Sequence, residues 1–123
     1  MEVALPEVPY RVEKPWGYEL VWARTDRYVG KLLHVRAGHV LSLQYHNRKD
    51  ETIYVQRGTM KFEIGPQGGP LKTVEMRPGD SVHVTPLTVH RMTAIDDCDL
   101  LEVSTPELDD VVRIEDRYGR EGT

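Results

Sequence analysis

The stretch of sequence that decides the fold is GHVLSLQYHNRKDETIYVQRG, residues 38–58. Side chains two apart on a β-strand point to the same face, so Gln44 and His46 should project an amide oxygen and an imidazole nitrogen into one space. Glu51 opens the next predicted strand, where its carboxylate can meet them from across a turn. His90 arrives from a separate pair of strands further along the chain. We predict that these four side chains meet at one site.

The four side chains form a mixed ligand set of two imidazole nitrogens, one carboxylate and one amide oxygen. This set suits a borderline or fairly hard divalent metal ion. An amide buried there without a partner would cost roughly 1 to 3 kcal/mol, and a carboxylate would cost more. We therefore predict one divalent metal ion, held by Gln44, His46, Glu51 and His90.

Alternating apolar and polar residues surround this stretch on both sides and predict short β-strands. Residues 65–70 are rich in Gly and Pro and predict a surface loop. Pro78 and Gly79 occupy the two central positions of a type II turn. No segment between Trp16 and Ser104 has a sustained helical period. The sequence therefore predicts an all-β antiparallel sandwich or jelly-roll barrel, with strands over residues 18–22, 28–35, 40–46, 51–56, 59–64, 71–76, 81–85, 90–95 and 100–104.

The chain of 123 residues is long enough for one hydrophobic core, so we predict a single domain. Residues 1–14 carry prolines and little periodicity, which suits an extended N-terminal arm. Residues 15–123 should form the barrel together with a densely charged C-terminal segment. That segment, 107–120, is predicted as either a last strand or a short helix.

Composition excludes several classes of function. The net charge is −4 and the basic residues are scattered among acids, which argues against nucleic-acid binding. The chain start has no basic region followed by an apolar run, and no stretch of about 18 apolar residues occurs. We therefore expect a cytoplasmic protein with no membrane partner. Cys98 has no second cysteine to pair with, and its acidic neighbours should keep the thiol unreactive.

The glycines and ligands of residues 38–58 resemble the first signature motif of the cupin superfamily, with Gln44 where many cupins have histidine. Residues 79–90, in which His90 lies eleven positions after a Gly-Asp turn, resemble the second motif. The resemblance implies the cupin double-stranded β-helix, a jelly-roll barrel.

Three phrases resemble, more narrowly, the type II mannose-6-phosphate isomerase domain. They are KPWG at 14–17, LSLQYH at 41–46 and RIEDRYGR at 113–120. That domain is usually the C-terminal half of a bifunctional enzyme whose other half is a mannose-1-phosphate guanylyltransferase. The resemblance implies a metal-dependent isomerase that converts mannose 6-phosphate, or a close sugar phosphate, to the ketose through a metal-stabilised enediolate. The expected metal is zinc, with manganese, nickel, iron and cobalt as alternatives.

Basic residues should bind the phosphate and take part in the reaction. Lys31 and Arg117 are the predicted catalytic residues, and Arg91 and Arg120 are predicted to bind the substrate phosphate. The proton-transfer base stays open between Lys31, His83 and a metal-bound water. Two other functions also stay open: a non-catalytic, metal-containing carbohydrate-binding cupin, and an iron-dependent dioxygenase.

Other side chains are predicted to be structural. We expect core positions for two tryptophans and a methionine: Trp16, Trp22 and Met60. Packed or solvent-facing positions are expected for three histidines: His34, His39 and His83. An outward apolar face formed by Leu41, Leu43 and Tyr45, together with the arm, predicts a homodimer.

Overall fold

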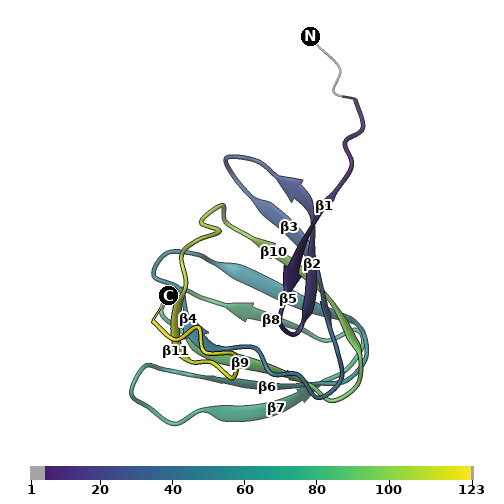
Figure 1. Cartoon of the computed structure of the whole chain (residues 1–123). Coiled ribbons are helices and arrows are strands. Elements are labelled where there is room, and N and C mark those ends of the chain that lie inside the picture. Colours follow the sequence, from purple (N-terminus) through teal and green to yellow (C-terminus); the bar gives the residue numbers. More distant parts are fainter. Residues whose placement is uncertain (1–4, 123) are drawn as a thin grey trace.

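Two antiparallel β-sheets face each other in the computed structural model, which describes residues 5–122 (Figure 1). One sheet has six strands in the order β1-β2-β3-β10-β5-β8, and the other has five in the order β11-β4-β9-β6-β7. The strands are β1 (Tyr10–Lys14), β2 (Gly17–Arg24), β3 (Val29–Val35), β4 (Leu43–Tyr45), β5 (Glu51–Arg57), β6 (Met60–Gly65), β7 (Lys72–Met76), β8 (Ser81–Val84), β9 (Val89–Ala94), β10 (Cys98–Ser104) and β11 (Val112–Glu115).

The all-β prediction is confirmed, and the strands differ from the predicted ones mainly in length. The strand predicted over residues 40–46 shortens to β4, because Val40 forms only an isolated bridge with Thr93. The charged segment 107–120, for which the sequence allows a strand or a short helix, contains β11, which pairs antiparallel with β4. Within the described residues, no helix is long and apolar enough to cross a membrane.

The core lies between the sheets and is built from alternating positions of the strands. Ile53 and Val55 of β5 and Met60 and Phe62 of β6 are almost completely buried. Burial of a side chain of this size contributes roughly 1.5 to 3 kcal/mol. Glu51 is in the same alternation as the two β5 side chains, so the pattern that builds the core also turns this carboxylate inward.

Trp22 is 50% exposed, and its predicted core position is therefore wrong. The register between β2 and β3 skips Trp22, which is the extra residue of a β-bulge. Its ring lies against Gly30, where a Cβ atom would collide with it. Trp16 and Met60 are buried, as predicted.

The predicted outward face of the 41–45 segment is also wrong for its two leucines. Leu41 belongs to the core cluster of this chain, and Leu43 is buried as well. The homodimer stays a prediction, but these two side chains no longer argue for it.

The predicted N-terminal arm joins the six-stranded sheet at its end. Residues 1–4 lie outside the described part of the chain, residues 5–9 extend away from the sheets, and β1 pairs with β2 (Figure 1). Leu5 and Val8 on the extending segment are exposed. The arm therefore adds an edge strand beside the inner-facing side chains of β2.

Candidate metal centre

Two histidines from one sheet and a glutamate from the other meet between the sheets. His90 Nε2 on β9 lies 3.2 Å from Glu51 Oε1 on β5. His46 Nε2, just after β4, lies 3.4 Å from the same oxygen. All three residues are buried, and their ligand atoms lie within 4.8 Å of one another. The structure therefore brings together three of the four predicted ligands.

Hydrogen bonds at the far side of each imidazole fix where its proton lies. His46 Nδ1 lies 2.6 Å from the backbone oxygen of Asp110, and His90 Nδ1 lies 2.9 Å from that of Thr88. A carbonyl oxygen only accepts, so both Nδ1 atoms donate. In the neutral imidazole each Nε2 atom then presents a lone pair to the Glu51 carboxylate.

This arrangement places acceptor against acceptor at the centre of the site. Neither Nε2 atom has a hydrogen-bond partner, although both are buried. Lone pairs that converge on a carboxylate repel one another unless a cation lies between them. Two imidazole nitrogens and one carboxylate oxygen are ligands that zinc and neighbouring divalent metals accept. The residues present fit a divalent metal ion.

Asp110 holds the loop that carries His46 into position. Its carboxylate accepts hydrogen bonds from the backbone N–H groups of Asn47 (3.0 Å), Arg48 (2.6 Å) and Lys49 (2.9 Å). Burial alone would raise the pKa of Asp110, but these N–H groups and His46 lower it to about 2. One residue therefore fixes both the loop backbone and the His46 ring.

A buried lysine lies beside the metal-ligand cluster. Lys49 Nζ lies 3.0 Å from Glu51 Oε2 and 3.3 Å from Glu102 Oε2. Burial alone would lower the pKa of Lys49, but Glu102 and Glu51 outweigh it and raise the pKa above its usual value. Burial and the Glu51 charge raise the pKa of Glu102. Lys49 thus neutralises charge where two buried carboxylates meet.

A second ion pair continues this network along the six-stranded sheet. Lys31 Nζ on β3 lies 3.1 Å from Glu19 Oε1 on β2, and both side chains are largely buried. Lys31 is also the cross-strand partner of Glu102 on β10. The predicted catalytic lysine therefore faces the same space as the metal-ligand cluster.

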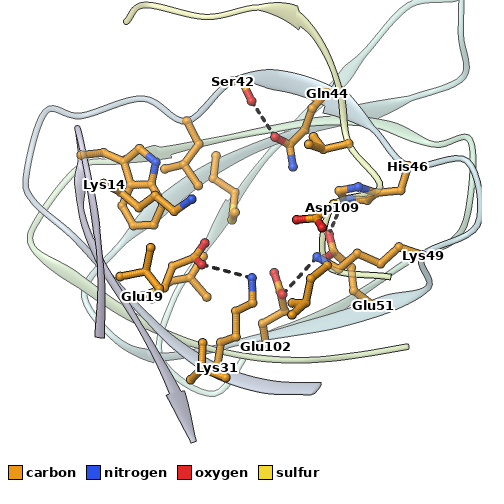
Figure 2. Close-up of a pocket in the computed structure, with 18 of the residues that line it drawn as sticks. Lys14, Glu19, Lys31, Ser42, Gln44, His46, Lys49, Glu51, Glu102 and Asp109 are labelled. Atoms are coloured by element: carbon orange, nitrogen blue, oxygen red, sulfur yellow. Dashed lines mark hydrogen bonds and ion pairs between the residues drawn. The ribbon is translucent and has the colours of Figure 1, made fainter. Parts of the chain in front are cut away.

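A cavity of about 300 Å³ lies in front of this network (Figure 2). Its lining includes six basic side chains and four acidic ones, although the whole chain has a net charge of −4. The cavity is therefore more positive than the protein around it. The basic residues are Lys14, Arg24, Lys31, Lys49, Arg113 and Arg120, and the acidic ones are Glu19, Glu51, Glu102 and Asp109.

Gln44, the fourth predicted ligand, lines the cavity and is the cross-strand partner of His90. Its Oε1 accepts a hydrogen bond from Ser42 Oγ at 2.5 Å. Figure 2 shows this oxygen on the side of Ser42 and the amide nitrogen on the side of the cavity. Metal ligation by Gln44 stays a prediction, and in this structure the ligating atom is engaged elsewhere.

The four basic residues predicted for catalysis and for phosphate binding separate into two groups. Arg120 lines the cavity with Lys31. Arg91 and Arg117 line a different pocket, outside the five-stranded sheet. Arg91 follows His90 directly on β9, so strand alternation turns it to the outer face, where it pairs with Glu63 at 3.1 Å. Arg117 instead donates a hydrogen bond to the Gly38 backbone oxygen at 2.8 Å.

The remaining histidines and the cysteine lie outside the cavity. His34 contacts Asp99, His39 contacts Tyr118, and the exposed His83 contacts Asp50, so His83 is not placed to act as the base. Cys98 is buried, and burial and its acidic neighbours raise the pKa of its thiol to about 11. The prediction of an unreactive cysteine agrees with this environment.

Sequence reasoning missed several residues of the site, namely Glu19, Lys49, Glu102, Asp110 and Arg113. A signal existed for Glu102, because it shares strand parity with the buried Leu100 and Ser104. A charged side chain in phase with buried positions indicates a buried ion pair or a site. No comparable local signal marks Asp110, whose carboxylate accepts hydrogen bonds only from residues more than 60 positions away.

Comparison with known proteins gives matches over most of the chain. The model of the family described as Cupin domain matches residues 31–104. The chain is 36% identical over 115 residues to mannose-1-phosphate guanylyltransferase of Escherichia coli (strain K12), a match that covers 89% of this chain and 23% of that protein. The same values hold for the Salmonella typhimurium protein of that name. The chain thus spans about a quarter of the length of these relatives.

Solved structures share the fold at low sequence identity. KdgF from Halomonas sp. matches with a TM-score of 0.71 and 22% identity, covering 81% of this chain and 88% of that one. A variant of oxalate decarboxylase from B. subtilis matches with a TM-score of 0.75 and 12% identity, covering 92% and 34%. With these folds, the spacing of the ligands and the family match over residues 31–104, the chain belongs to the cupin family.

Proposed function

We propose that the chain is a metal-dependent isomerase of a sugar phosphate, with mannose 6-phosphate and fructose 6-phosphate as the leading pair. One observation carries the proposal: the buried His46, Glu51 and His90 cluster adjoins a cavity in which basic side chains outnumber acidic ones. An anionic, hydroxyl-rich ligand suits such a space. The relatives named for a mannose phosphate support this choice of sugar.

The metal would be held by His46, Glu51 and His90, and zinc is the first candidate because it binds such nitrogen and oxygen ligands while keeping an open position. When bound, a divalent ion supplies Lewis-acid stabilisation of the negative charge that develops beside a sugar carbonyl. Asp110 and Thr88 fix the two imidazole rings from behind. The site is therefore organised before a ligand arrives.

Isomerisation of an aldose to a ketose moves one proton between neighbouring carbons and another between their oxygens. We assign Lys31 a part in the proton transfer between the two sugar oxygens, because its Nζ is a hydrogen-bond donor that adjoins the cavity and is held 3.1 Å from Glu19 Oε1. Arg117 receives no part in this reaction, because it lines the other pocket.

A coupled assay of metal-reconstituted protein tests the proposal. Mannose 6-phosphate should be converted to fructose 6-phosphate, and solvent deuterium should appear at the first carbon of the fructose 6-phosphate that forms. Glu51→Gln should lose both signals, whereas Lys61→Gln, on the outer surface, should keep them. Failure to turn over any hexose or pentose phosphate would overturn the isomerase proposal, and tight binding without turnover would favour a carbohydrate-binding role.

A further inference from the structure

Two arginines of the C-terminal segment reach the cavity that the metal-ligand cluster adjoins. Arg113 lies on β11 and Arg120 follows five residues beyond the end of this strand, and both line the cavity. Arg113 enters from the five-stranded sheet and Arg120 from the segment that follows it, whereas Lys31 and Glu19 enter from the six-stranded sheet. The two arginines therefore line a different wall of the cavity from Lys31 and Glu19.

Arg113 belongs to a row of side chains that leads directly to a predicted metal ligand. It is the cross-strand partner of Gln44 on β4, and Gln44 is the cross-strand partner of His90 on β9. Directly opposite residues project to the same face of a sheet. Neighbouring strands lie about 4.8 Å apart, so the backbones of Arg113 and His90 are roughly 10 Å apart.

Arg120 is held in a fixed orientation by a buried acid. Asp116, whose side chain is fully buried, accepts hydrogen bonds from Arg120 Nε at 2.8 Å and Nη2 at 3.1 Å. The guanidinium also lies 5.8 Å from the centre of the Tyr118 ring, and the Tyr118 hydroxyl contacts His39. A planar donor group fixed in this way is organised for bidentate contact with an oxyanion.

The two guanidinium groups are close enough to interact unfavourably. Burial and the positive charge of Arg120 lower the pKa of Arg113, and Asp116 and Glu19 offset this in part. Like charges that share a partly buried wall are stabilised by an anion that binds between them. Phosphate, with about two negative charges at neutral pH, matches such a pair.

We propose that Arg113 and Arg120 bind the phosphate of the substrate while its carbonyl end lies at the His46, Glu51 and His90 cluster. An extended six-carbon chain with a terminal phosphate has about the length of the row from Arg113 to His90, since carbon–carbon bonds are about 1.5 Å long. This subsite rests on the proposed function for the identity of the sugar. It rests on the geometry of β11, β4 and β9 for the place of the phosphate.

Calorimetric titration with mannose 6-phosphate tests the subsite in zinc-loaded and in metal-free protein. Arg113→Gln should weaken binding by about 30-fold or more, because a charge-assisted bidentate contact is lost. Arg113→Lys should recover part of this loss. Arg117→Gln is the matched control, because it removes the same kind of side chain from the same segment outside the cavity, and it should change the affinity less than twofold.

Zinc content and the thermal midpoint of each variant show whether the rest of the site is intact. The proposal is overturned if wild-type protein does not bind mannose 6-phosphate, or if Arg113→Gln binds it as tightly as wild type does. It is also overturned if Arg113→Gln loses zinc in parallel with affinity. If the protein binds mannose 6-phosphate through Arg113 but does not convert it, the subsite is supported and the isomerase proposal is refuted. If the protein converts mannose 6-phosphate and Arg113→Gln does so equally well, the isomerase proposal is supported and the subsite is refuted.

Discussion

Lys49 is the buried cation whose replacement should destabilise the fold most without removing a predicted metal ligand. Its Nζ lies 3.0 Å from Glu51 and 3.3 Å from Glu102, and its side chain is 6% exposed. Lys49→Met keeps the length of the side chain and removes the charge. Two buried carboxylates would then face each other without their nearest counter-ion.

The cost follows from the burial and the distances. At 3.0 Å and an effective dielectric constant of about 20, one such contact has a Coulomb energy of about 5 kcal/mol, which the desolvation of the partners largely offsets. Removal of one partner forfeits the contact and leaves the desolvation in place. Breaking a buried pair in this way costs about 3 to 5 kcal/mol. We expect Lys49→Met to lose about 3 kcal/mol or more in the metal-free protein at pH 7.

Urea unfolding of metal-free protein measures this loss. The double variant Lys49→Met with Glu102→Gln should recover at least half of it, because only one buried carboxylate then remains. Lys61→Met is the control: the Lys61 side chain is 46% exposed and its Nζ lies 3.9 Å from Glu63 Oε1, so its removal should cost less than about 0.5 kcal/mol. A loss below about 1 kcal/mol for Lys49→Met, or no recovery in the double variant, would refute the reasoning.

Three further predictions concern other parts of the chain. Cys98 should resist a thiol reagent at pH 8 until the protein is unfolded, because burial raises its pKa to about 11; rapid labelling of folded protein would contradict this. The folded pKa of Asp110, about 2, lies below its usual 3.8, so its stabilising effect is present above pH 3.8 and is lost as the pH falls toward 2. Asp110→Asn should flatten this acid limb of the stability curve, and an unchanged limb would exclude the effect. Gly58→Ala should destabilise the fold by about 2 to 4 kcal/mol, because φ is 85° and the new methyl group would collide with the Asp97 backbone. Gly38→Ala is the control: φ is 82° but the space around it is open, so it should cost about 1 kcal/mol. Equal losses of stability in thermal unfolding of the two variants would count against the collision.

The fold and the inward side of Glu51 could be predicted because their signals are local, whereas His90 was predicted from its spacing after a Gly-Asp turn in the resemblance to cupins. The alternation of Glu51 with Ile53 and Val55 marks both the strand and its inner face. Gln44 and His46 are two positions apart, so strand alternation likewise predicts that they point to one face. These spacings place side chains on faces before any tertiary contact is known.

The place of Arg113 in the cavity wall could not be predicted, because it depends on pairing between distant strands. The sequence 113–120 offers three arginines with no local sign of which ones face inward. Pairing of β11 with β4 turns Arg113 into the cavity, and the register shift after it changes the alternation beyond. Arg117 consequently lies at the outer pocket. The prediction that Trp22 is a core residue was wrong for a similar reason, because its β-bulge is defined only by the pairing of β2 with β3.

Lys49 and Glu102 were missed because charged residues are ordinarily taken to be exposed. Each would be costly to bury alone, and only the fold shows that each neutralises the other. Their partnership spans 53 positions of sequence. A charged residue that alternates with the buried apolar residues of a strand, as Glu102 does, thus indicates a buried ion pair.

The central claim is that His46, Glu51 and His90 hold one divalent metal ion. Equilibrium dialysis of wild-type protein and His90→Ala against zinc, followed by elemental analysis, tests it most directly, with circular dichroism to verify that the variant keeps its strands. The account predicts one zinc ion per wild-type chain and a loss of at least 100-fold in affinity in the variant, because one of three protein ligands is removed. Equal zinc content and affinity in the two proteins would contradict it.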